Sequence, residues 1–564
     1  MFLDNLKEII VTELKLPKID FLYPPDVSLG DLSFACFELA KEQKKNPAEL
    51  AGELALSLNS RENLKKYFSE IKSVGPYLNF FINSLFLAEG ITGLIKKEKK
   101  LFGYNKSGAA RKVMLEYSNG NTHKEYHVGH LRNISYGDSV YRLLIANGYQ
   151  AIPVSYINDF GIHVAKTIWG WRQNDSYGQS KENKGRLLGK CYAEASQRLT
   201  DNPDDKEEVI EIMKEIESRA GDNYALWQKT RNWSIKYFAE IYQELNVKFA
   251  HIFYENEEID HGFKLVAELF DKGIFVKSEG AIIANLEKYS LGVLPIIRTD
   301  GTALYPVADL ALASEKFNKY DLDESIYVVD VRQSLYFKQL FKILELVGYK
   351  QKLVHLTYDF VTLPEGMMAS RTGNVVTYQD LKEKIWDKLI LETQNRHADW
   401  TAGRIKHVAW NLTISVIKFE MLKINADKII TFNIDEALKF EGYTACYLQY
   451  AYARLKSIVR KEKFSLFVTR ADLSRLTEQK EKNILLKLAK YPEVIKSAGR
   501  EFNPSELAKY LFELTQLTND YYHEFSILKA EKNIRQARLV LVKAIAQVLK
   551  NGYGILGMNA LEEM

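Results

Sequence analysis

Residues 113–133 read VMLEYSNGNTHKEYHVGHLRN, and the fold prediction is built outward from this stretch. The apolar run at 113–118 ends in Ser, Asn and Gly, which indicates a buried strand that stops at a loop. From Val128 onward apolar residues recur at helical spacing, and Asn147-Gly148 is typical of a helix end. A second strand is expected at 151–157. The pattern predicts one strand–loop–helix–strand unit of a parallel sheet.

The rest of the chain divides into three parts. Residues 1–103 predict a small α+β domain, with helices at 3–14, 32–43 and 47–57 and a strand at 73–83. Strands and helices alternate across 104–384, which predicts a doubly wound α/β, Rossmann-like domain with a mainly helical insertion at about 166–270. Further strands of its parallel sheet are expected at 281–284, 294–298, 325–330 and 355–363. Residues 385–564 have a helical period and predict an all-α bundle.

Composition indicates a globular, cytoplasmic protein without a membrane anchor. The chain has 564 residues, of which 46% are hydrophobic and 27% charged, and its mean hydropathy is -0.25. No run of 18 apolar residues occurs, and the first residues carry acids where a signal peptide is basic. The cysteines, Cys36, Cys191 and Cys446, are too far apart for a CxxC metal pair or a disulfide framework. The net charge of +4 does not distinguish a phosphate-binding face from an ordinary solvated one.

Two histidines stand at the predicted helix start. His127 and His130 are three residues apart and share one helix face, and Gly129 between them leaves that face bare. Free backbone N–H groups and the helix dipole favour an anion there, so the pair suits the phosphates of a nucleotide. Lys124 and Arg132 add positive charge on either side. A zinc pair lacks its remaining ligands in this sequence, and a pair of ordinary surface histidines is the other interpretation.

Acceptor groups follow several predicted strands. Glu116 interrupts the first strand near its end, Tyr305 and Asp309 are four residues apart after another, and Gln333 follows a third. Ligands of open parallel sheets bind at the carboxyl ends of strands, so these groups are expected in one pocket. Such a pocket suits a cation, above all a planar guanidinium that a carboxylate binds bidentately. Taken singly, each acid also fits a capping or loop position.

Two weaker patterns have open interpretations. Tyr77 and Asn79 alternate with apolar residues in the strand at 73–83, which fits either an edge strand that completes a local core or a surface that stacks unpaired bases. The polar loop at 364–377 contains Ser370 and Arg371 and fits a loop that closes over phosphates.

Taken together, these motifs resemble those of a class I aminoacyl-tRNA synthetase, and specifically the arginyl-tRNA synthetase family. Residues 116–132 are similar to that family's form of the HIGH motif, and 300–311 to its arginine-pocket helix. Residues 326–339 are close to a family fingerprint, and 441–454 resemble the start of its anticodon-binding domain. The ending at 555–564 fits as well. Five pieces in the right order and spacing make the resemblance specific.

The resemblance implies that arginine and ATP form arginyl-adenylate, and that the arginyl group then passes to the 3′ end of tRNA(Arg). It implies an N-terminal domain that contacts the tRNA D-loop, a catalytic domain and an anticodon-binding domain, in a monomer without a resident metal; Mg²⁺ accompanies the ATP. The implied catalytic residues are His127, His130, Lys124 and Arg371, and the ATP contacts are His127, Gly129, His130, Met368 and Ser370. The implied arginine contacts are Glu116, Ser118, Asn121, Tyr305, Asp309 and Gln333, and the tRNA contacts are Tyr77, Asn79, Tyr450 and Arg454.

One departure from the family pattern matters. The KMSK-type loop reads Met367-Met368-Ala369-Ser370 and contains neither lysine. The resemblance implies that a lysine just before the HIGH-type motif substitutes, and Lys124 occupies that place with Arg371 to help. Two alternatives stay open: a class I synthetase for another amino acid, and a catalytically inactive tRNA-binding paralogue.

Overall fold

The N-terminal domain is a three-stranded antiparallel sheet with helices around it. The computed structural model describes residues 2–16, 19–174, 176–362, 364, 376–462 and 471–564. The domain's elements are α1 (Phe2–Leu14), β1 (Leu32–Ala35), α2 (Phe37–Gln43), α3 (Pro47–Asn59), β2 (Phe68–Val74), β3 (Tyr77–Ile82) and α4 (Ser84–Glu98). The strand order is β1-β3-β2. The helix expected at 32–43 was wrong in its first half, because Leu32–Ala35 pairs with β3, a long-range contact that local periodicity does not reveal.

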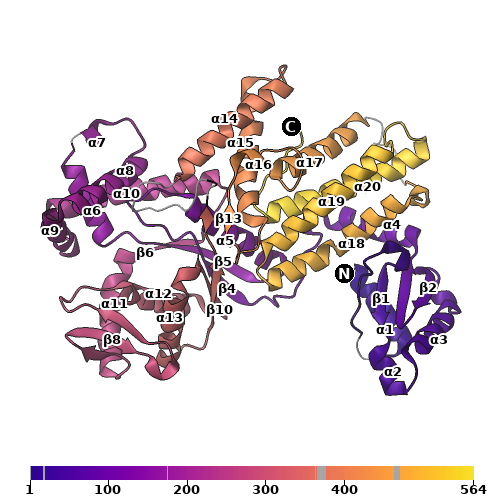
Figure 1. The fold of residues 1–564 in the computed structure, drawn as a ribbon, viewed down its shortest axis with the longest axis horizontal. Helices are drawn as coiled ribbons and strands as arrows, with labels where there is room; N and C mark the ends of the chain where they lie inside the picture. The colour runs from indigo at the N-terminus through magenta and orange to yellow at the C-terminus, as the bar shows by residue number, and fades with distance from the viewer. Residues whose placement is uncertain (1, 17–18, 175, 363, 365–375, 463–470) are drawn as a thin grey trace.

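A five-stranded parallel sheet forms the centre of the molecule (Figure 1). Its order is β11-β10-β4-β5-β6, and its strands are β4 (Lys112–Glu116), β5 (Gln150–Ile157), β6 (His251–Tyr254), β10 (Glu324–Asp330) and β11 (Lys352–Tyr358). Alternate residues enter two different hydrophobic cores, since Val113 and Leu115 pack on one face and Met114 on the other. The doubly wound sheet is thereby confirmed.

Helix α5 (Val128–Ala146) crosses one face of the sheet at close range. His127 caps its N-terminus, and Asn147 and Gly148 follow its last residue as expected. A Cβ built on Gly137 meets the Cγ of Tyr117 at 2.3 Å, so only glycine allows this approach of helix and strand. The spacing between α5 and β4 is therefore set by a missing side chain.

The opposite face is covered by a separate lobe. It contains α11 (Glu255–Asp271), α12 (Tyr305–Tyr320) and α13 (Ser334–Val347), with β7 (Val276–Ser278), β8 (Ala281–Asn285) and β9 (Val293–Ile297). The prediction that 281–284 and 294–298 continue the parallel sheet was wrong. These segments form an antiparallel three-stranded sheet of their own, because residues 286–292 join them by a short turn where a parallel pair needs a crossover.

Five helices follow β5, namely α6 (Ile162–Arg172), α7 (Ser176–Gln179), α8 (Lys184–Asp201), α9 (Lys206–Glu217) and α10 (Gly221–Glu244). The range 166–270 is mainly helical as expected, but it also contains β6, which has four residues and joins the sheet edge. So short a strand leaves no periodic signal.

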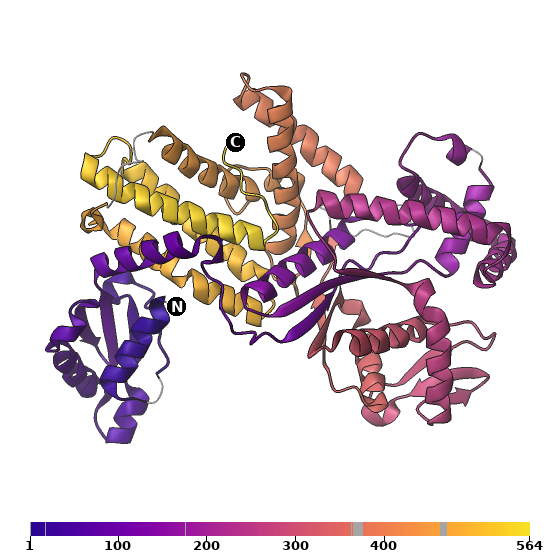
Figure 2. The same ribbon diagram turned by 180° about the vertical axis from the view of Figure 1, so that it is seen from behind.

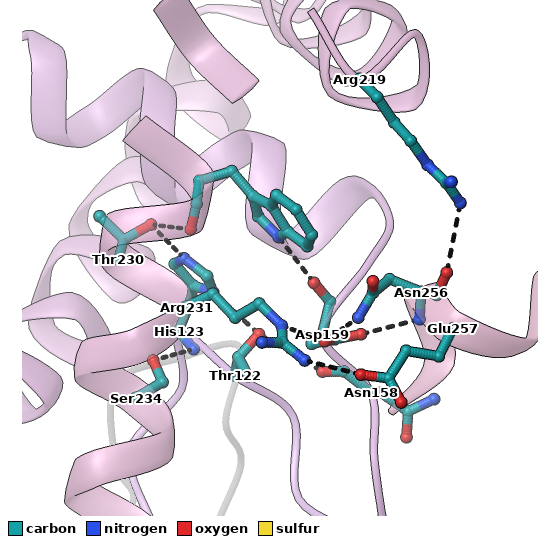
Figure 3. Close-up of polar contacts among 11 residues, drawn as sticks. Thr122, His123, Asn158, Asp159, Arg219, Thr230, Arg231, Ser234, Asn256 and Glu257 are labelled. Atoms are coloured by element: carbon teal, nitrogen blue, oxygen red, sulfur yellow. Dashed lines mark hydrogen bonds and ion pairs between the residues drawn. The ribbon is translucent and has the colours of Figure 1, made fainter. Parts of the chain in front are cut away.

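A buried polar network fixes α10 to the end of the sheet (Figure 3). Arg231 of α10 forms an ion pair with Asp159, whose side chain is fully buried, and Asp159 also accepts the backbone N–H of Asn256 at 2.9 Å. On the other side of Arg231, the Nε2 of His123 lies 2.8 Å from the Thr230 hydroxyl. His123 is buried with a φ of 64°, so this network holds an unfavourable backbone conformation in the loop before α5.

The C-terminal part is a helical bundle that also contacts the N-terminal domain. Its helices are α14 (Tyr378–Arg396), α15 (Ala402–Leu422), α16 (Ile434–Ala437), α17 (Ala445–Lys461), α18 (Gln479–Arg500), α19 (Pro504–Glu524) and α20 (Lys532–Ile555), and the short strands β12 (Val361–Thr362) and β13 (Ile430–Thr431) pair beside it. Seen from behind, α4 lies along α18 and α20 (Figure 2).

Two ion pairs fasten the same contact between the ends of the chain. Lys7 lies 2.6 Å from Glu493, and Lys482 lies 2.8 Å from Asp31. Apolar residues of both domains also belong to one hydrophobic cluster. In the described part of the chain, no helix is both long enough and apolar enough to cross a membrane.

Gly137→Ala is expected to lower the melting temperature by about 1–3 °C, because the added methyl group collides with Tyr117 at a cost of about 1–3 kcal/mol. Gly93→Ala is the matched control. Gly93 lies on the exposed side of α4 with no atom within 4 Å of a built Cβ, and alanine there is expected to add up to about 1 kcal/mol. Equal melting temperatures for the two variants would contradict the tight packing of α5 on β4.

Candidate active site

One cavity of about 600 Å³ opens at the carboxyl ends of β4, β5 and β10, beside the N-terminus of α5. This is the edge at which open parallel sheets bind ligands. The sequence-predicted residues that line it are Glu116, Asn121, His127, Gly129, His130, Arg132, Tyr305, Asp309 and Gln333, of which Arg132 donates to the backbone carbonyl of Asn425 at 2.9 Å. Residues from distant parts of the chain therefore share one site, with the histidines at the start of α5 and the acids on β4 and α12.

The two histidines form a reciprocal cap at the start of α5. The backbone N–H of Gly129 donates to Nδ1 of His127 at 3.1 Å, and the backbone N–H of His127 donates to Nδ1 of His130 at 3.1 Å. Since both Nδ1 atoms accept, the hydrogen bonds assign the ring proton to Nε2 in each neutral ring. The ring centroids lie 3.8 Å apart, and a Cβ on residue 129 would contact the His127 ring at 3.0 Å. The turn thus presents two Nε2–H donors beside a helix N-terminus.

Burial keeps these rings neutral. Burial lowers the pKa of His127 to about 4, with a smaller contribution from the charge of Lys124. The pKa of His130 lies well below its usual value, first because of burial and then because of His127 and Lys124. Both rings are therefore uncharged at neutral pH and donate through Nε2–H. An anion beside them meets these donors and not the Nδ1 lone pairs, which already accept backbone N–H groups.

Lys124 lies next to this pair but outside the cavity lining. It is half-buried, and its Nζ lies 5.0 Å from the centre of the Tyr192 ring. Burial, and then the charge of Lys166, lower the pKa of Lys124. Because its charge acts on both His127 and His130, the lysine is close enough to add positive potential at the phosphate-suited end of the cavity.

The other end of the cavity is acidic. The Tyr336 hydroxyl donates to the carboxylate of Asp309, and burial raises the pKa of Asp309 to about 7. Tyr305, one turn earlier on α12, is 62% exposed at the mouth. Glu116 is buried and forms an ion pair with Lys316, and its second oxygen accepts the Asn119 amide at 2.8 Å. This end combines carboxylates and phenols.

Two sequence-predicted contacts do not lie where a ligand reaches. Ser118 is buried outside the cavity, and its hydroxyl lies 2.9 Å from that of Tyr126. Its φ of 61° turns the chain, so the next residue, Asn119, lines the cavity instead. Asn79 is only 3% exposed and accepts a hydrogen bond from Ser33, because β3 is the central strand and β1 lies beside it. The predictions that Ser118 contacts arginine and that Asn79 contacts tRNA are therefore wrong for these side chains as the structure places them.

The remaining predicted residues lie far from the cavity or outside the described chain. Tyr77, at the start of β3, is 39% exposed. Tyr450 and Arg454 are half-buried on α17, where the guanidinium lies 5.1 Å from the centre of the Tyr450 ring. Met368, Ser370 and Arg371 lie outside the described residues. Among the residues that the structure describes, no cluster of three His, Cys, Asp or Glu side chains is arranged to hold a metal.

Sequence reasoning missed several residues of the site. Asn119, Tyr156, Asn158 and Tyr336 line the cavity, and Lys316 lies against Glu116. Lys316 follows Asp309 by seven residues on the same helix, so helical spacing alone gave a signal for it. Tyr336 and Asn158 come from loops and a helix that meet the site only through the tertiary fold.

Comparisons with known proteins first define the class. Residues 91–434 match the family model "tRNA synthetases class I (R), catalytic domain", residues 448–564 match "DALR anticodon binding domain", and residues 1–82 match "Arginyl tRNA synthetase N terminal domain". The chain is thus a class I aminoacyl-tRNA synthetase.

Relatives narrow the class to one family. An arginine–tRNA ligase of Bdellovibrio bacteriovorus is 34% identical over 96% of this chain and 93% of its own, and one of Clostridium perfringens is 32% identical over 100% and 99%. The arginyl-tRNA synthetase of Thermus thermophilus has a TM-score of 0.81 at 26% identity, with 100% of both chains covered. That of Plasmodium falciparum, at 21% identity, shares the fold with a TM-score of 0.76 over 99% and 97%. The chain belongs to the arginyl-tRNA synthetase family.

Proposed function

We propose that the protein is an arginine–tRNA ligase. It activates L-arginine with ATP to arginyl-adenylate, releases pyrophosphate, and transfers the arginyl group to the 3′ end of tRNA(Arg). The observation that carries this proposal is a single cavity with two neutral imidazole donors at a helix N-terminus on one side and acidic groups on the other. Phosphates suit the first side and a guanidinium suits the second.

The histidine side binds ATP. In the activation step an oxygen of the arginine carboxylate attacks the α-phosphorus in line, and the bond to pyrophosphate breaks. The Nε2–H groups of His127 and His130 donate to the phosphate oxygens as charge develops, and Gly129 allows the nucleotide to approach the backbone. Met368 and Ser370 are assigned further ATP contacts, and Arg371 a charge on the phosphates. Mg²⁺ arrives with ATP, whose phosphates supply its principal ligands.

The acidic side binds arginine. Asp309 takes the guanidinium, with Tyr305 at the mouth and Glu116 deeper in the cavity, while Asn121 and Gln333 orient the α-amino and carboxylate groups. A carboxylate that accepts two N–H groups of one guanidinium forms the strongest and most directional contact available to this substrate. The Asp309–Tyr336 hydrogen bond supports this assignment, since it fixes the carboxylate without consuming both of its oxygens.

The domains at the two ends of the chain bind tRNA. Residues 1–103 are assigned the D-loop contact through exposed Tyr77, and residues 385–564 the anticodon contact, in which the paired Tyr450 and Arg454 offer a ring and a charge. Residues 104–384 carry the catalysis. The protein is proposed to act as a cytoplasmic monomer, in keeping with its three free, buried cysteines.

Charging of total tRNA with each of the labelled amino acids tests this function. Arginine alone is expected to be incorporated, because the acidic pocket requires a cation with two N–H edges. Incorporation of another amino acid points to a different class I synthetase. Absence of any incorporation, together with retained tRNA binding, points to a catalytically inactive paralogue.

Lys124→Ala is expected to lower tRNA-dependent arginylation by about 10²-fold, the usual effect of losing one group that stabilises transition-state charge. Lys124 stands in for the lysines that residues 367–370 lack, and its charge reaches His127 and His130. Lys229→Ala, which removes an exposed lysine of α10, is the control and is expected to keep full activity. Activity of the Lys124 variant within about twofold of the wild type would refute the role.

The KM for arginine is expected to rise about tenfold as the pH falls from 8 to 6. Burial raises the pKa of Asp309 to about 7, so the carboxylate that holds the guanidinium becomes protonated across this range. Asp309→Asn is expected to raise KM and flatten the profile. The pKa of buried Glu255, behind Asn158, is raised to about 8, so Glu255→Gln is measured alongside. A profile that flattens in Glu255→Gln but not in Asp309→Asn would assign the titration to Glu255 and contradict the role given to Asp309.

A further inference from the structure

Lys316 is a fully buried cation next to the acidic end of the cavity. It lies on the same face of α12 as Tyr305, Asp309 and Leu312, which line the cavity at positions i, i+4 and i+7 of a series that Lys316 continues at i+11. Its side chain is 0% exposed, and its Nζ lies 5.0 Å from the centre of the Tyr327 ring and 5.5 Å from that of Phe253. A charge so completely removed from water requires a partner.

That partner is Glu116, one of the carboxylates assigned to arginine. One Glu116 oxygen pairs with Lys316 and the other accepts the Asn119 amide. Glu116 lines the cavity, whereas Lys316 does not, so the ammonium lies behind the carboxylate as seen by a ligand. A substrate cation therefore meets a carboxylate whose inner side is already occupied.

This arrangement treats two kinds of cation differently. A guanidinium spreads its charge over a plane and presents two N–H edges, so it reaches Asp309 and the outer lone pairs of Glu116 together. An ammonium is a compact point charge, and it must come close to Glu116, and so to Lys316, to gain the same attraction. Lys316 therefore repels an ammonium more strongly than a guanidinium. This repulsion adds specificity that attraction to the carboxylates alone does not supply.

We propose that Lys316 is a specificity-determining residue of the arginine pocket, a built-in cation behind Glu116 that makes the pocket reject ammonium side chains such as that of lysine. The proposal rests on the proposed arginine–tRNA ligase function. The competing interpretation is an ion pair that serves folding only, which is common for buried pairs. The two differ in whether the loss of the charge changes the choice of substrate.

Lys316→Met removes the charge and keeps the length of the side chain, and Lys316→Arg keeps the charge. With both, the KM for arginine, the inhibition constant of L-lysine, the KM for ATP and the melting temperature are measured. In Lys316→Met, L-lysine is expected to inhibit at about tenfold lower concentration relative to the KM for arginine, because Glu116 then lacks an internal cation. In Lys316→Arg the ratio is expected to stay within about twofold. The KM for ATP stays unchanged in both, since Lys316 pairs with Glu116 at the acidic end and not with the histidines.

A folded Lys316→Met variant that retains wild-type discrimination would overturn the proposal and leave Lys316 a structural residue. Because an unpaired buried Glu116 destabilises the fold, the neutral double variant Glu116→Gln/Lys316→Met is prepared in parallel. It is expected to recover the melting temperature while losing arginine affinity and discrimination against lysine. Recovery of all three would equally overturn the proposal. Failure of the wild type to charge arginine would instead reject the proposed function itself.

Discussion

The hydrogen bonds at the start of α5 are the constraint on which the site depends. Backbone N–H groups at a helix N-terminus lack partners within the helix, and here the imidazoles of His127 and His130 accept two of them. The same bonds fix the tautomers, so the two imidazoles that cap the helix keep their Nε2–H groups free to donate. In each ring, Nδ1 therefore stabilises the start of the helix, and the opposite nitrogen, Nε2, is left to donate to a ligand.

The side chains along the central strands alternate between the two faces of the sheet. Along β4, residues Val113 and Leu115 pack under α5 and Met114 packs under the lobe of α12, so the cavity forms at the end of the strand where the two cores part. The histidine side of the cavity presents neutral rings at a helix N-terminus, and the other side presents carboxylates and phenols. Opposite electrostatic demands are met by elements from opposite faces of one sheet.

The parts of the fold that local sequence determines were predictable. The unit from β4 to β5, the histidine pair and the acids after strand ends all follow from periodicity and from the rule that ligands bind at carboxyl ends. The failures depend on distant pairing. The helix expected over Leu32–Ala35 became β1 because β3 lies beside it, and Asn79 is buried for the same reason. Ser118 points away from the cavity because its φ is positive, and no residue pattern predicts that angle.

The contact between the first and last domains has a consequence for how the protein is made. Lys7 and Asp31 find their partners, Glu493 and Lys482, on α18, near the far end of the chain. The N-terminal domain leaves the ribosome long before α18 is synthesised, so the surfaces of α1 and α4 that contact α18 remain exposed to solvent through most of synthesis. Assembly of this molecule is consequently completed only when translation is almost over, and a chain truncated before α18 leaves an apolar surface exposed that favours aggregation.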